Sequence, residues 1–262
     1  NMKCRNCKSD LKTSFVDLGS SPYSNSYLNF ENLYEAEKWF PLKVLVCSSC
    51  WLVQTQDIAN FEDIFDNDYA YFSSYSTTLL EHSLRYVEKM IQKYNYDNKS
   101  LVVEVASNDG YLLQNFVKKN IPCLGIEPTK NTAKVAKSKG IKVVESFFDE
   151  EVALNLVKQN KKADLMIANN VLAHVPDILG FLKSFDILLK ENGIATFEFP
   201  HVMSLIRNKQ FDTIYHEHFS YLSLTSIMNI FPKCGLKVFD IEEITTHGGS
   251  LRVYACKNNS KF

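Results

Sequence analysis

The sequence predicts an α/β fold built on a mostly parallel sheet, and three observations carry this prediction. An apolar run over residues 101–105 stops abruptly in the small and polar residues 107–110, as a doubly buried strand does before a tight turn. A helical pattern follows, with Leu113, Phe116 and Val117 on one face. Strand and helix patterns then alternate to the end of the chain, which is typical of repeated βα units.

The elements can be placed in order. Strands are expected over residues 101–105, 123–126, 142–144, 163–168, 194–199, 236–243 and 250–256, and the helices between them over residues 131–139, 150–159 and 177–189. The last two strands are joined by only five residues, short enough for a hairpin. Five βα units and a terminal hairpin give a seven-stranded, Rossmann-like mixed sheet with one antiparallel strand, the architecture of class I methyltransferases.

Residues 1–60 differ in character because they contain two Cys-x-x-Cys pairs, Cys4 with Cys7 and Cys47 with Cys50. Each pair lets two thiolates meet one ion, and two pairs complete the tetrahedral site of structural zinc. An expected strand over residues 42–46 leads into the second pair, as in zinc ribbons. A redox Cys-x-x-Cys is the alternative, but two copies without an adjoining βαβ pattern favour zinc.

Composition limits the class of protein. The 262 residues are 45% apolar, and 29 basic and 30 acidic side chains give a net charge of −1. The overall charge therefore gives no reason to expect a nucleic acid or an anionic membrane as partner. No apolar stretch approaches the roughly 20 residues that span a bilayer. Seven cysteines, an odd number, predict a reducing cytoplasm, and we favour a monomer.

An aromatic connector lies between the cysteine-rich lobe and the α/β repeats, and we place the domain boundaries at residues 1–60, 61–98 and 99–262. The crowded aromatic residues of 61–76 indicate a packed linker or a lid over a cleft. A helix is expected from about Thr78, where Thr78 and Glu81 resemble a capping box. Its expected buried stripe consists of Leu80, Leu84, Val87, Ile91 and Tyr94.

The turn after the first α/β strand could hold a dinucleotide or S-adenosylmethionine. A dinucleotide fold needs glycines where this chain has Ala106, Asn108 and Tyr111, so that pattern fails. S-adenosylmethionine needs an acid on the first strand, a close-approach turn and a carboxylate at the end of the second strand. The residues that meet these needs are Glu104; Ala106, Ser107, Asn108, Asp109 and Gly110; Glu127 and Pro128; and, near the methionine part, Asn169 and Asn170.

A reactive cluster follows the fifth strand of the α/β repeats. Tyr215, His216, Glu217 and His218 place a phenol, two imidazoles and a carboxylate within four residues. Methyl transfer to carbon requires a carbanion equivalent, such as an enolate formed beside a ketone. A histidine oriented by a carboxylate can act as the base, and a tyrosine or second histidine can donate to the enolate oxygen. His174 could reach the same cleft. A solvated loop and a His-x-His metal site are the alternatives.

Six blocks of the chain together resemble the sugar C-methyltransferases. They are residues 104–113 (EVASNDGYLL), 124–128 (LGIEP), 169–177 (NNVLAHVPD), 197–201 (FEFPH), 215–221 (YHEHFSY) and 246–254 (THGGSLRVY). The resemblance covers nearly the whole chain, including the zinc lobe. It implies methylation at C-3 of a nucleotide-linked 4-keto-6-deoxy sugar in deoxysugar biosynthesis, with S-adenosylmethionine as cofactor and structural zinc.

The resemblance also implies residue roles. His218 would be the base that removes the C-3 proton, with Glu217 and Tyr215 in the same site. His174 and Tyr69 would complete it, which favours a lid over a linker for the connector. Tyr71 and Tyr75 lie close enough to Tyr69 to be alternatives. The cofactor would lie over the turn 106–110, with Glu127 on the ribose and Asn169 near the methionine end.

The chain departs from this family at its end. Family members continue past the last strand into a C-terminal domain that helps hold the nucleotide-sugar, whereas this chain stops at Phe262. We therefore expect a shortened member, either truncated or naturally short. Two other functions stay open: a sugar or small-molecule O-methyltransferase on the same fold, and a non-catalytic zinc-ribbon interaction protein.

Overall fold

The computed structural model describes residues 2–24, 27–56 and 72–262, apart from the side chain of His247. Its strands are β1 (Thr13–Ser21), β2 (Phe40–Val46), β3 (Val53–Thr55), β4 (Val102–Val105), β5 (Cys123–Ile126), β6 (Lys142–Val144), β7 (Ala163–Asn169), β8 (Leu189–Pro200), β9 (Ser220–Tyr221), β10 (Leu236–Ile244) and β11 (Ser250–Lys257). Its α-helices are α1 (Thr77–Tyr94), α2 (Leu113–Lys118), α3 (Lys130–Ser138), α4 (Glu150–Lys158), α5 (Ile178–Leu188), α6 (Val202–Asn208) and α7 (Leu224–Ile230).

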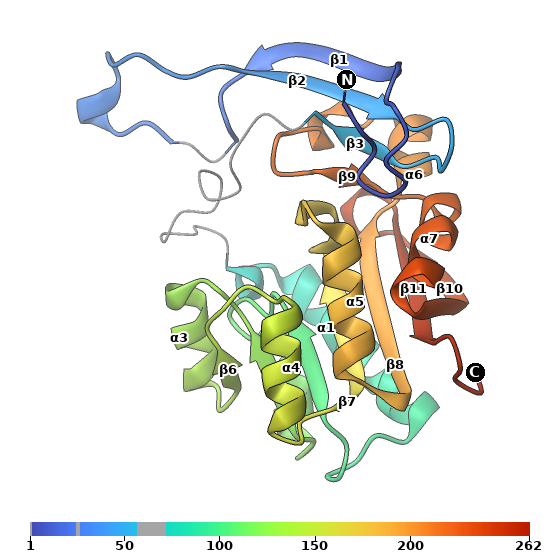
Figure 1. Ribbon diagram of the computed structural model, residues 1–262. Coiled ribbons are helices and arrows are strands. Elements are labelled where there is room, and N and C mark those ends of the chain that lie inside the picture. Colours follow the sequence, from blue (N-terminus) through green and yellow to red (C-terminus); the bar gives the residue numbers. More distant parts are fainter. Residues whose placement is uncertain (1, 25–26, 57–71) are drawn as a thin grey trace.

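A seven-stranded sheet forms the body of the molecule (Figure 1). Its strand order is β10-β11-β8-β7-β4-β5-β6. The strands from β8 to β6 run parallel, whereas β11 is antiparallel to both of its neighbours. This confirms the predicted fold class, with its single antiparallel strand. Because β4 and β7 are adjacent, their carboxyl ends open on one edge, where ligands bind in such sheets.

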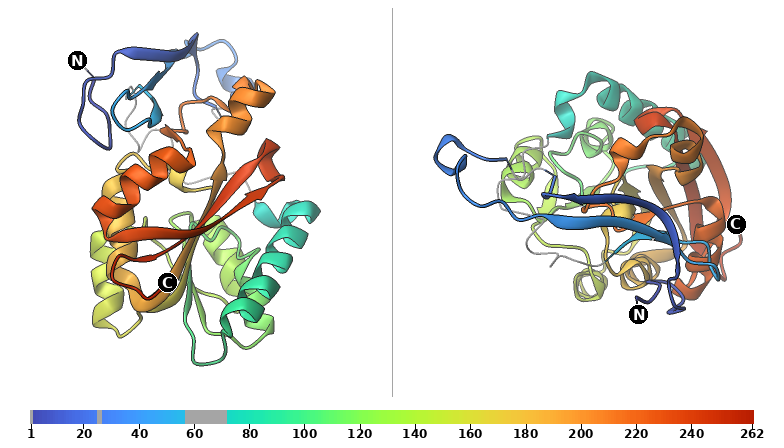
Figure 2. Two further views of the ribbon diagram at one scale, coloured as in Figure 1. Left: turned by 90° about the vertical axis from the view of Figure 1, so that its right-hand side faces the viewer. Right: turned by 90° about the horizontal axis from the view of Figure 1, so that it is seen from above.

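Helices cover both faces of this sheet, because alternate residues of each strand face opposite sides. Val103 and Val105 of β4 belong to one core, with residues of α4, α5 and α7. Val102 belongs to the other core, with residues of α1, α2 and α3. Figures 1 and 2 show α4 and α5 on one side and α1 on the other. Buried on both faces, the parallel strands need the apolar sequences that predicted them.

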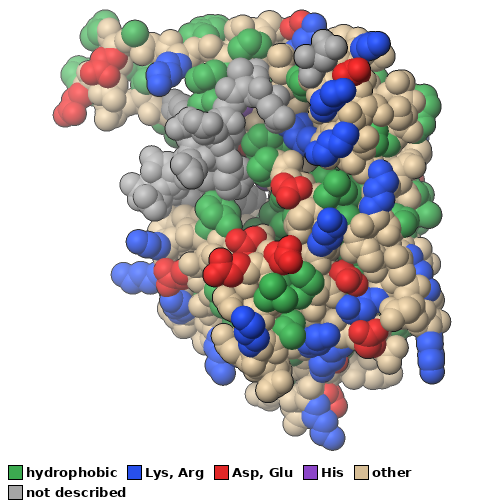
Figure 3. Space-filling model, viewed as in Figure 1, with side chains coloured by type: hydrophobic (Ala, Val, Ile, Leu, Met, Phe, Trp, Pro, Cys, Tyr) green, Lys and Arg blue, Asp and Glu red, His purple; other side chains and the backbone are tan. Residues whose placement is uncertain are grey.

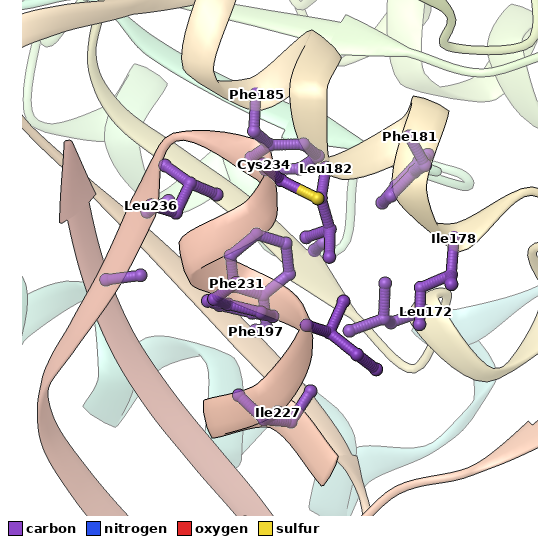
Figure 4. Close-up of a cluster of buried hydrophobic side chains, with 14 of the residues drawn as sticks. Leu172, Ile178, Phe181, Leu182, Phe185, Phe197, Ile227, Phe231, Cys234 and Leu236 are labelled. Carbon is purple, nitrogen blue, oxygen red and sulfur yellow. The ribbon is translucent and has the colours of Figure 1, made fainter. Parts of the chain in front are cut away.

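Phenylalanine rings in mutual contact fix α5 and the C-terminal part of the chain against β8 (Figure 4). The rings of Phe185 and Phe197 have centroids 4.7 Å apart, and those of Phe197 and Phe231 are 5.1 Å apart. All three side chains are fully buried. Such tilted and edge-on contacts are the favoured aromatic geometries. These ring contacts hold β8 in place just before the strand reaches the carboxyl edge of the sheet.

A second sheet lies over the carboxyl edge of the first (Figures 1 and 2). It is antiparallel, with the order β1-β2-β3-β9. The first three strands come from the N-terminal lobe, but β9 comes from residues 220–221, directly after the reactive cluster. In register, Val53 pairs with Tyr221 and Gln54 with Ser220. The strand that follows the reactive cluster is therefore hydrogen-bonded to the lobe in one sheet.

The start of α1 differs from its prediction. Ser76 is the N-cap, and its side chain accepts a hydrogen bond from the Leu79 N–H, so the Thr78 capping box is wrong. The predicted stripe is wrong in part, since Leu84 is 41% exposed. Val87 is buried as expected, but Tyr86 is buried too and shares a 2.7 Å hydrogen bond with Thr196. Tyr86 therefore lies on the buried face of α1, where this hydrogen bond holds its side chain.

The surface carries charges of both signs. On the face shown in Figure 3, Lys and Arg side chains are interspersed with Asp and Glu. None of the helices in the described ranges is long and apolar enough to cross a lipid bilayer.

Candidate active site

The turn after β4 has an unusual backbone. Ala106, Asn108 and Gly110 all have positive φ, at 55°, 50° and 75°. This conformation is strained for alanine, and such outliers gather at ligand sites. At Gly110 an added Cβ would lie 2.3 Å from Ile141 Cδ1, so only glycine fits. The sequence thus folds residues 106–110 into a sharp turn that brings backbone close to the sheet edge.

Buried polar atoms without a hydrogen-bond partner gather at this edge. Among the described residues they include Glu104 Oε2, Ser107 Oγ, Asp109 Oδ1, Asn169 Oδ1 and Asn170 Oδ1. All five residues were predicted to bind the cofactor. They come from the adjacent strands β4 and β7 and the turns that follow them. Buried polar atoms are rarely left unpaired in folded proteins, so these atoms are available to bind a ligand or ordered water. Burial, with the charges of Glu127 and Asp109, raises the pKa of Glu104.

Glu127 lies at the end of β5 and is only 4% exposed. Its two carboxylate oxygens accept backbone hydrogen bonds, Oε2 from Asn108 N–H and Oε1 from Thr129 N–H, both at 2.9 Å. These bonds fix the carboxylate beside the β4 turn. Each oxygen keeps a second lone pair, so the carboxylate can still accept from two neighbouring hydroxyls such as those of a ribose.

The end of the aromatic connector lies on the same turn. The Ser73 N–H donates to Asn108 Oδ1 at 2.9 Å, and the Ser74 N–H and hydroxyl donate to Asp109 Oδ2. Sequence reasoning missed these serines. Tyr75 is 82% exposed and stacks on Phe72. Tyr69 and Tyr71 lie outside the described residues, so the lid hypothesis for them stays a prediction.

His218 is held by two hydrogen bonds that fix its tautomer. Its Nδ1 lies 2.9 Å from the Thr213 carbonyl oxygen, which can only accept, so Nδ1 carries the proton. Its Nε2 lies 2.8 Å from the Tyr215 hydroxyl and therefore accepts from it. The basic nitrogen of His218 thus faces a phenolic donor. A backbone carbonyl thus orients this histidine through Nδ1.

His174 contacts His218 from the other side. The ring centroids are 4.6 Å apart in an edge-on arrangement. Burial and the nearby His218 lower the pKa of His174 to about 3, against a hydrogen bond with the Glu217 backbone that raises it. His174 is therefore neutral near pH 7 and a weak base. It can orient a substrate or donate a hydrogen bond, which leaves His218 as the better candidate base.

The other two members of the cluster have hydrogen-bond partners in the N-terminal lobe. Glu217 is 4% exposed, and its Oε1 accepts a hydrogen bond from the Ser24 hydroxyl at 3.3 Å. His216 lies edge-on to the stacked rings of Tyr23 and Phe40, and its Nε2 donates to the Pro41 carbonyl at 3.2 Å. The structure therefore brings Tyr215, His218 and His174 together, while His216 joins the N-terminal lobe.

The reactive cluster adjoins the polar edge. His174 lies four residues after Asn170, in the 3-10 turn Leu172–His174 that follows β7. The Phe219 N–H donates to the Ala173 carbonyl at 2.8 Å, which ties the two loops together. A ligand held at Asn169 and Asn170 would thus lie next to the two joined loops, one of which carries His174 and the other His218.

The four predicted metal ligands converge in the N-terminal lobe. The sulfurs of Cys4, Cys7, Cys47 and Cys50 all lie within 4.8 Å of one another. Cys4 Sγ is 3.5 Å from Cys50 Sγ, and Cys7 Sγ is 3.4 Å from Cys47 Sγ. Tetrahedral zinc with bonds of about 2.3 Å places its sulfurs about 3.8 Å apart, so the thiols fit this metal.

Removing one zinc ligand should destabilise the lobe. We expect Cys47→Ser to lose bound zinc and to unfold at a lower temperature, because structural zinc contributes about 10 kcal/mol or more to the folding of small domains. Metal analysis and a thermal melt measure both effects. Cys234→Ser is the matched control, since Cys234 is buried far along the chain from the cluster. Full zinc content in Cys47→Ser would contradict the four-cysteine site.

The fold and site define the protein as a class I S-adenosylmethionine-dependent methyltransferase. The defining features are the strand order of the larger sheet, the strained turn after β4 and the buried acids that follow. Solved structures share this fold. One is magnesium protoporphyrin IX methyltransferase (ChlM) from Synechocystis PCC 6803 with bound SAH, with a TM-score of 0.55 and 13% identity over 68% of this chain and 83% of that chain. Another is an S-adenosylmethionine-dependent methyltransferase from Clostridium acetobutylicum ATCC 824, with a TM-score of 0.52 and 14% identity over 67% and 90% of the two chains.

Sequence families agree with this class. The Methyltransf_13 model, a zinc binding domain, matches residues 4–65, and the Methyltransf_23 model, a methyltransferase domain, matches residues 77–241. The chain belongs to the family of methyltransferases that this second model describes. It is also 34% identical over 253 residues to C-methyltransferase NovU from Streptomyces niveus. That alignment covers 97% of this chain, which spans 60% of the length of NovU. The predicted fold, cofactor and zinc-binding lobe are thus confirmed.

Proposed function

We propose that this protein methylates C-3 of a nucleotide-linked 4-keto-6-deoxy sugar, with His218 as the base that forms an enolate. The observation that carries the proposal is the His218–Tyr215 pair, whose basic nitrogen and phenolic donor lie 2.8 Å apart. A base and an acid so close can serve two neighbouring atoms of one substrate. The similarity to NovU, described as a C-methyltransferase, supports carbon as the acceptor.

The chemistry follows from this pair. His218 Nε2 takes the proton from C-3, which is acidic because it adjoins the C-4 carbonyl. When the substrate binds, the Tyr215 hydroxyl turns from His218 Nε2 to the oxygen on which negative charge develops and donates its hydrogen bond there, which frees the Nε2 lone pair. The imidazolium that forms is stabilised by its Nδ1–H bond to the Thr213 carbonyl. His174 beside it is neutral and therefore adds no positive charge that would repel the imidazolium.

Bound S-adenosylmethionine supplies a methyl group on a sulfonium sulfur. Transfer of this methyl group to C-3 of the enolate would break the sulfur–methyl bond and leave a neutral thioether. The sulfonium and enolate charges cancel, and His218 later returns its proton to solvent. In this proposal Glu104, the turn 106–110, Glu127, Pro128, Asn169 and Asn170 hold the cofactor. Glu217 and Tyr69 stay candidates for substrate contacts.

Deuterium exchange tests the enolate step. In D2O without the cofactor, the protein should exchange the C-3 proton of the keto-sugar, and His218→Gln should not. The C-5 proton is also next to the ketone, so exchange at C-3 alone would show that the base is positioned and not merely present. Methyl transfer to the sugar without any C–H exchange would contradict the proposal and favour O-methylation.

Glu127 provides a separate prediction for the cofactor. Glu127→Gln should raise the Kd for S-adenosylmethionine about 10- to 100-fold, because hydrogen bonds to a charged acceptor contribute about 1.5–3 kcal/mol. Calorimetric titration measures this change. Glu145→Gln is the control, since its carboxylate lies on the surface, paired with Lys137. An unchanged Kd in Glu127→Gln would remove Glu127 from the cofactor site.

A further inference from the structure

Arg5 connects the zinc-binding cysteines to the loop that carries His218. It follows Cys4 in the first Cys-x-x-Cys turn and is only 8% exposed. Its Nη1 donates to two backbone carbonyls, those of Thr55 and Phe219, each at 3.0 Å. Its Cζ also lies 5.3 Å from the centroid of the Phe219 ring. A side chain of the metal-binding turn thus holds the residue next to His218.

Thr55 holds the same segment from β3. Its Oγ1 donates to the His218 carbonyl at 3.0 Å, and its N–H donates to the Phe219 carbonyl at 3.2 Å. On the opposite side, the Phe219 N–H donates to Ala173. The carbonyls of His218 and Phe219 are therefore fixed by the N-terminal lobe, whereas the loop of His174 fixes the amide between them.

The metal-binding turns set the place of Arg5 in this arrangement. Gln54 accepts the Arg5 N–H through Oε1 at 3.0 Å and donates through Nε2 to Cys4 Sγ at 3.3 Å. The second cysteine pair ends at Cys50, three residues before β3 begins at Val53. The second cysteine turn thus leads directly into the strand that hydrogen-bonds the His218 segment, and the first turn is bonded to the same strand through Gln54. A shift of either turn would reach His218 through short, buried connections.

We propose that Arg5 is a positioning residue for His218, through which the zinc-binding lobe sets the geometry of the base. The proposal rests on the base role of His218 stated above. Both ring bonds of His218, to Thr213 and to Tyr215, depend on where its backbone lies. A displacement of about 1 Å at a reacting group can lower a rate about 100-fold. The lobe therefore serves catalysis as well as stability.

Arg5→Gln tests this role, with Lys3→Gln as the matched control. Lys3 directly precedes the same turn, but its side chain is 58% exposed and forms an ion pair with the partly exposed Asp10. We expect Arg5→Gln to lower kcat about 10- to 100-fold. Zinc content should stay at the wild-type level, and the Kd for S-adenosylmethionine should change less than about twofold. Lys3→Gln should match the wild type in all three.

The tautomer and hydrogen bonding of His218, which depend on its position, are read from the 15N resonances of its imidazole, assigned with His218→Gln and recorded without substrate. Arg5→Gln should shift these resonances, whereas Lys3→Gln should not. A wild-type kcat in Arg5→Gln, or a reduced kcat with unshifted His218 resonances, would overturn the proposal. A fully active His218→Ala would instead overturn the base role, so the two failures are distinguishable.

A second variant tests the same proposal if Arg5→Gln loses zinc or fails to fold. Thr55→Val keeps the shape of the side chain and removes only the hydroxyl that donates to the His218 carbonyl. It should shift the same imidazole resonances and lower kcat in the same direction, with full zinc content. If Thr55→Val leaves both the resonances and kcat at wild-type values, the lobe does not position His218.

Discussion

His218→Ala is expected to lower kcat about 10³- to 10⁴-fold, the upper part of the range for loss of a general base. The loss should fall on kcat, because the polar atoms that we propose for cofactor binding belong to Glu104, Ser107, Asp109 and the two asparagines after β7. The Kd for S-adenosylmethionine should therefore change less than about threefold. Steady-state kinetics and calorimetric titration separate the two effects.

His216→Gln is the control for this prediction. His216 is two residues from His218 in sequence, but its imidazole donates to the Pro41 carbonyl within the N-terminal lobe. Glutamine keeps a donor, so kcat should stay within about threefold of the wild type. Full activity in His218→Ala would remove this residue from catalysis, whatever the control shows.

Arg252→Met is expected to lower the free energy of unfolding by about 3–5 kcal/mol, the cost of leaving a buried charge without its partner. Arg252 and Glu198 are 2% and 1% exposed, and their side chains meet at 2.6 Å. His82 of α1 hydrogen-bonds the same carboxylate, and Glu242 accepts from Arg252. Urea unfolding measures the loss.

Two variants separate charge from packing. Lys93→Met breaks the exposed pair of Lys93 with Asp240 and should change the free energy of unfolding by less than about 1 kcal/mol. Adding Glu198→Gln to Arg252→Met removes the uncompensated carboxylate and should recover part of the stability. If Arg252→Met alone lies within about 1 kcal/mol of the wild type, the buried pair does not stabilise the fold.

The same carboxylate gives a pH dependence. Burial alone would raise the pKa of Glu198, but the hydrogen bond with His82 and the charge of Arg252 lower it from 4.5 to about 2. A depressed pKa in the folded state means that the stabilisation is fully present above the unfolded value. It is lost as the pH falls from about 4.5 through about 2. Glu198→Gln should flatten the stability curve in this range.

Local patterns predicted most of the larger sheet. The expected ranges 123–126 and 142–144 coincide with β5 and β6, and the C-terminal hairpin was expected from its short turn. Buried parallel strands are apolar on both faces, so their patterns are strong. Which residues of α1 face the core was less predictable. The Tyr86 side chain carries a polar hydroxyl but points inward, because this hydroxyl shares a hydrogen bond with Thr196.

The site was predictable where it follows strand ends and unpredictable where it depends on long-range pairing. Acids and amides at the ends of β4, β5 and β7 follow directly from the strand pattern. In contrast, β9 pairs residue 221 with residue 53, and no local signal indicates such a partner. Arg5, Thr55 and Ser73 were missed for this reason, since each acts through backbone contacts far along the chain.

The central claim is methyl transfer to C-3, and the position of the new methyl group tests it most directly. The protein is incubated with a nucleotide-linked 4-keto-6-deoxy sugar and S-adenosylmethionine labelled with 13C at the methyl carbon, and the product is examined by NMR. The account predicts a C-methyl signal coupled to C-3, which no longer carries a proton. A methoxy signal with the C-3 proton retained would contradict it and identify an O-methyltransferase.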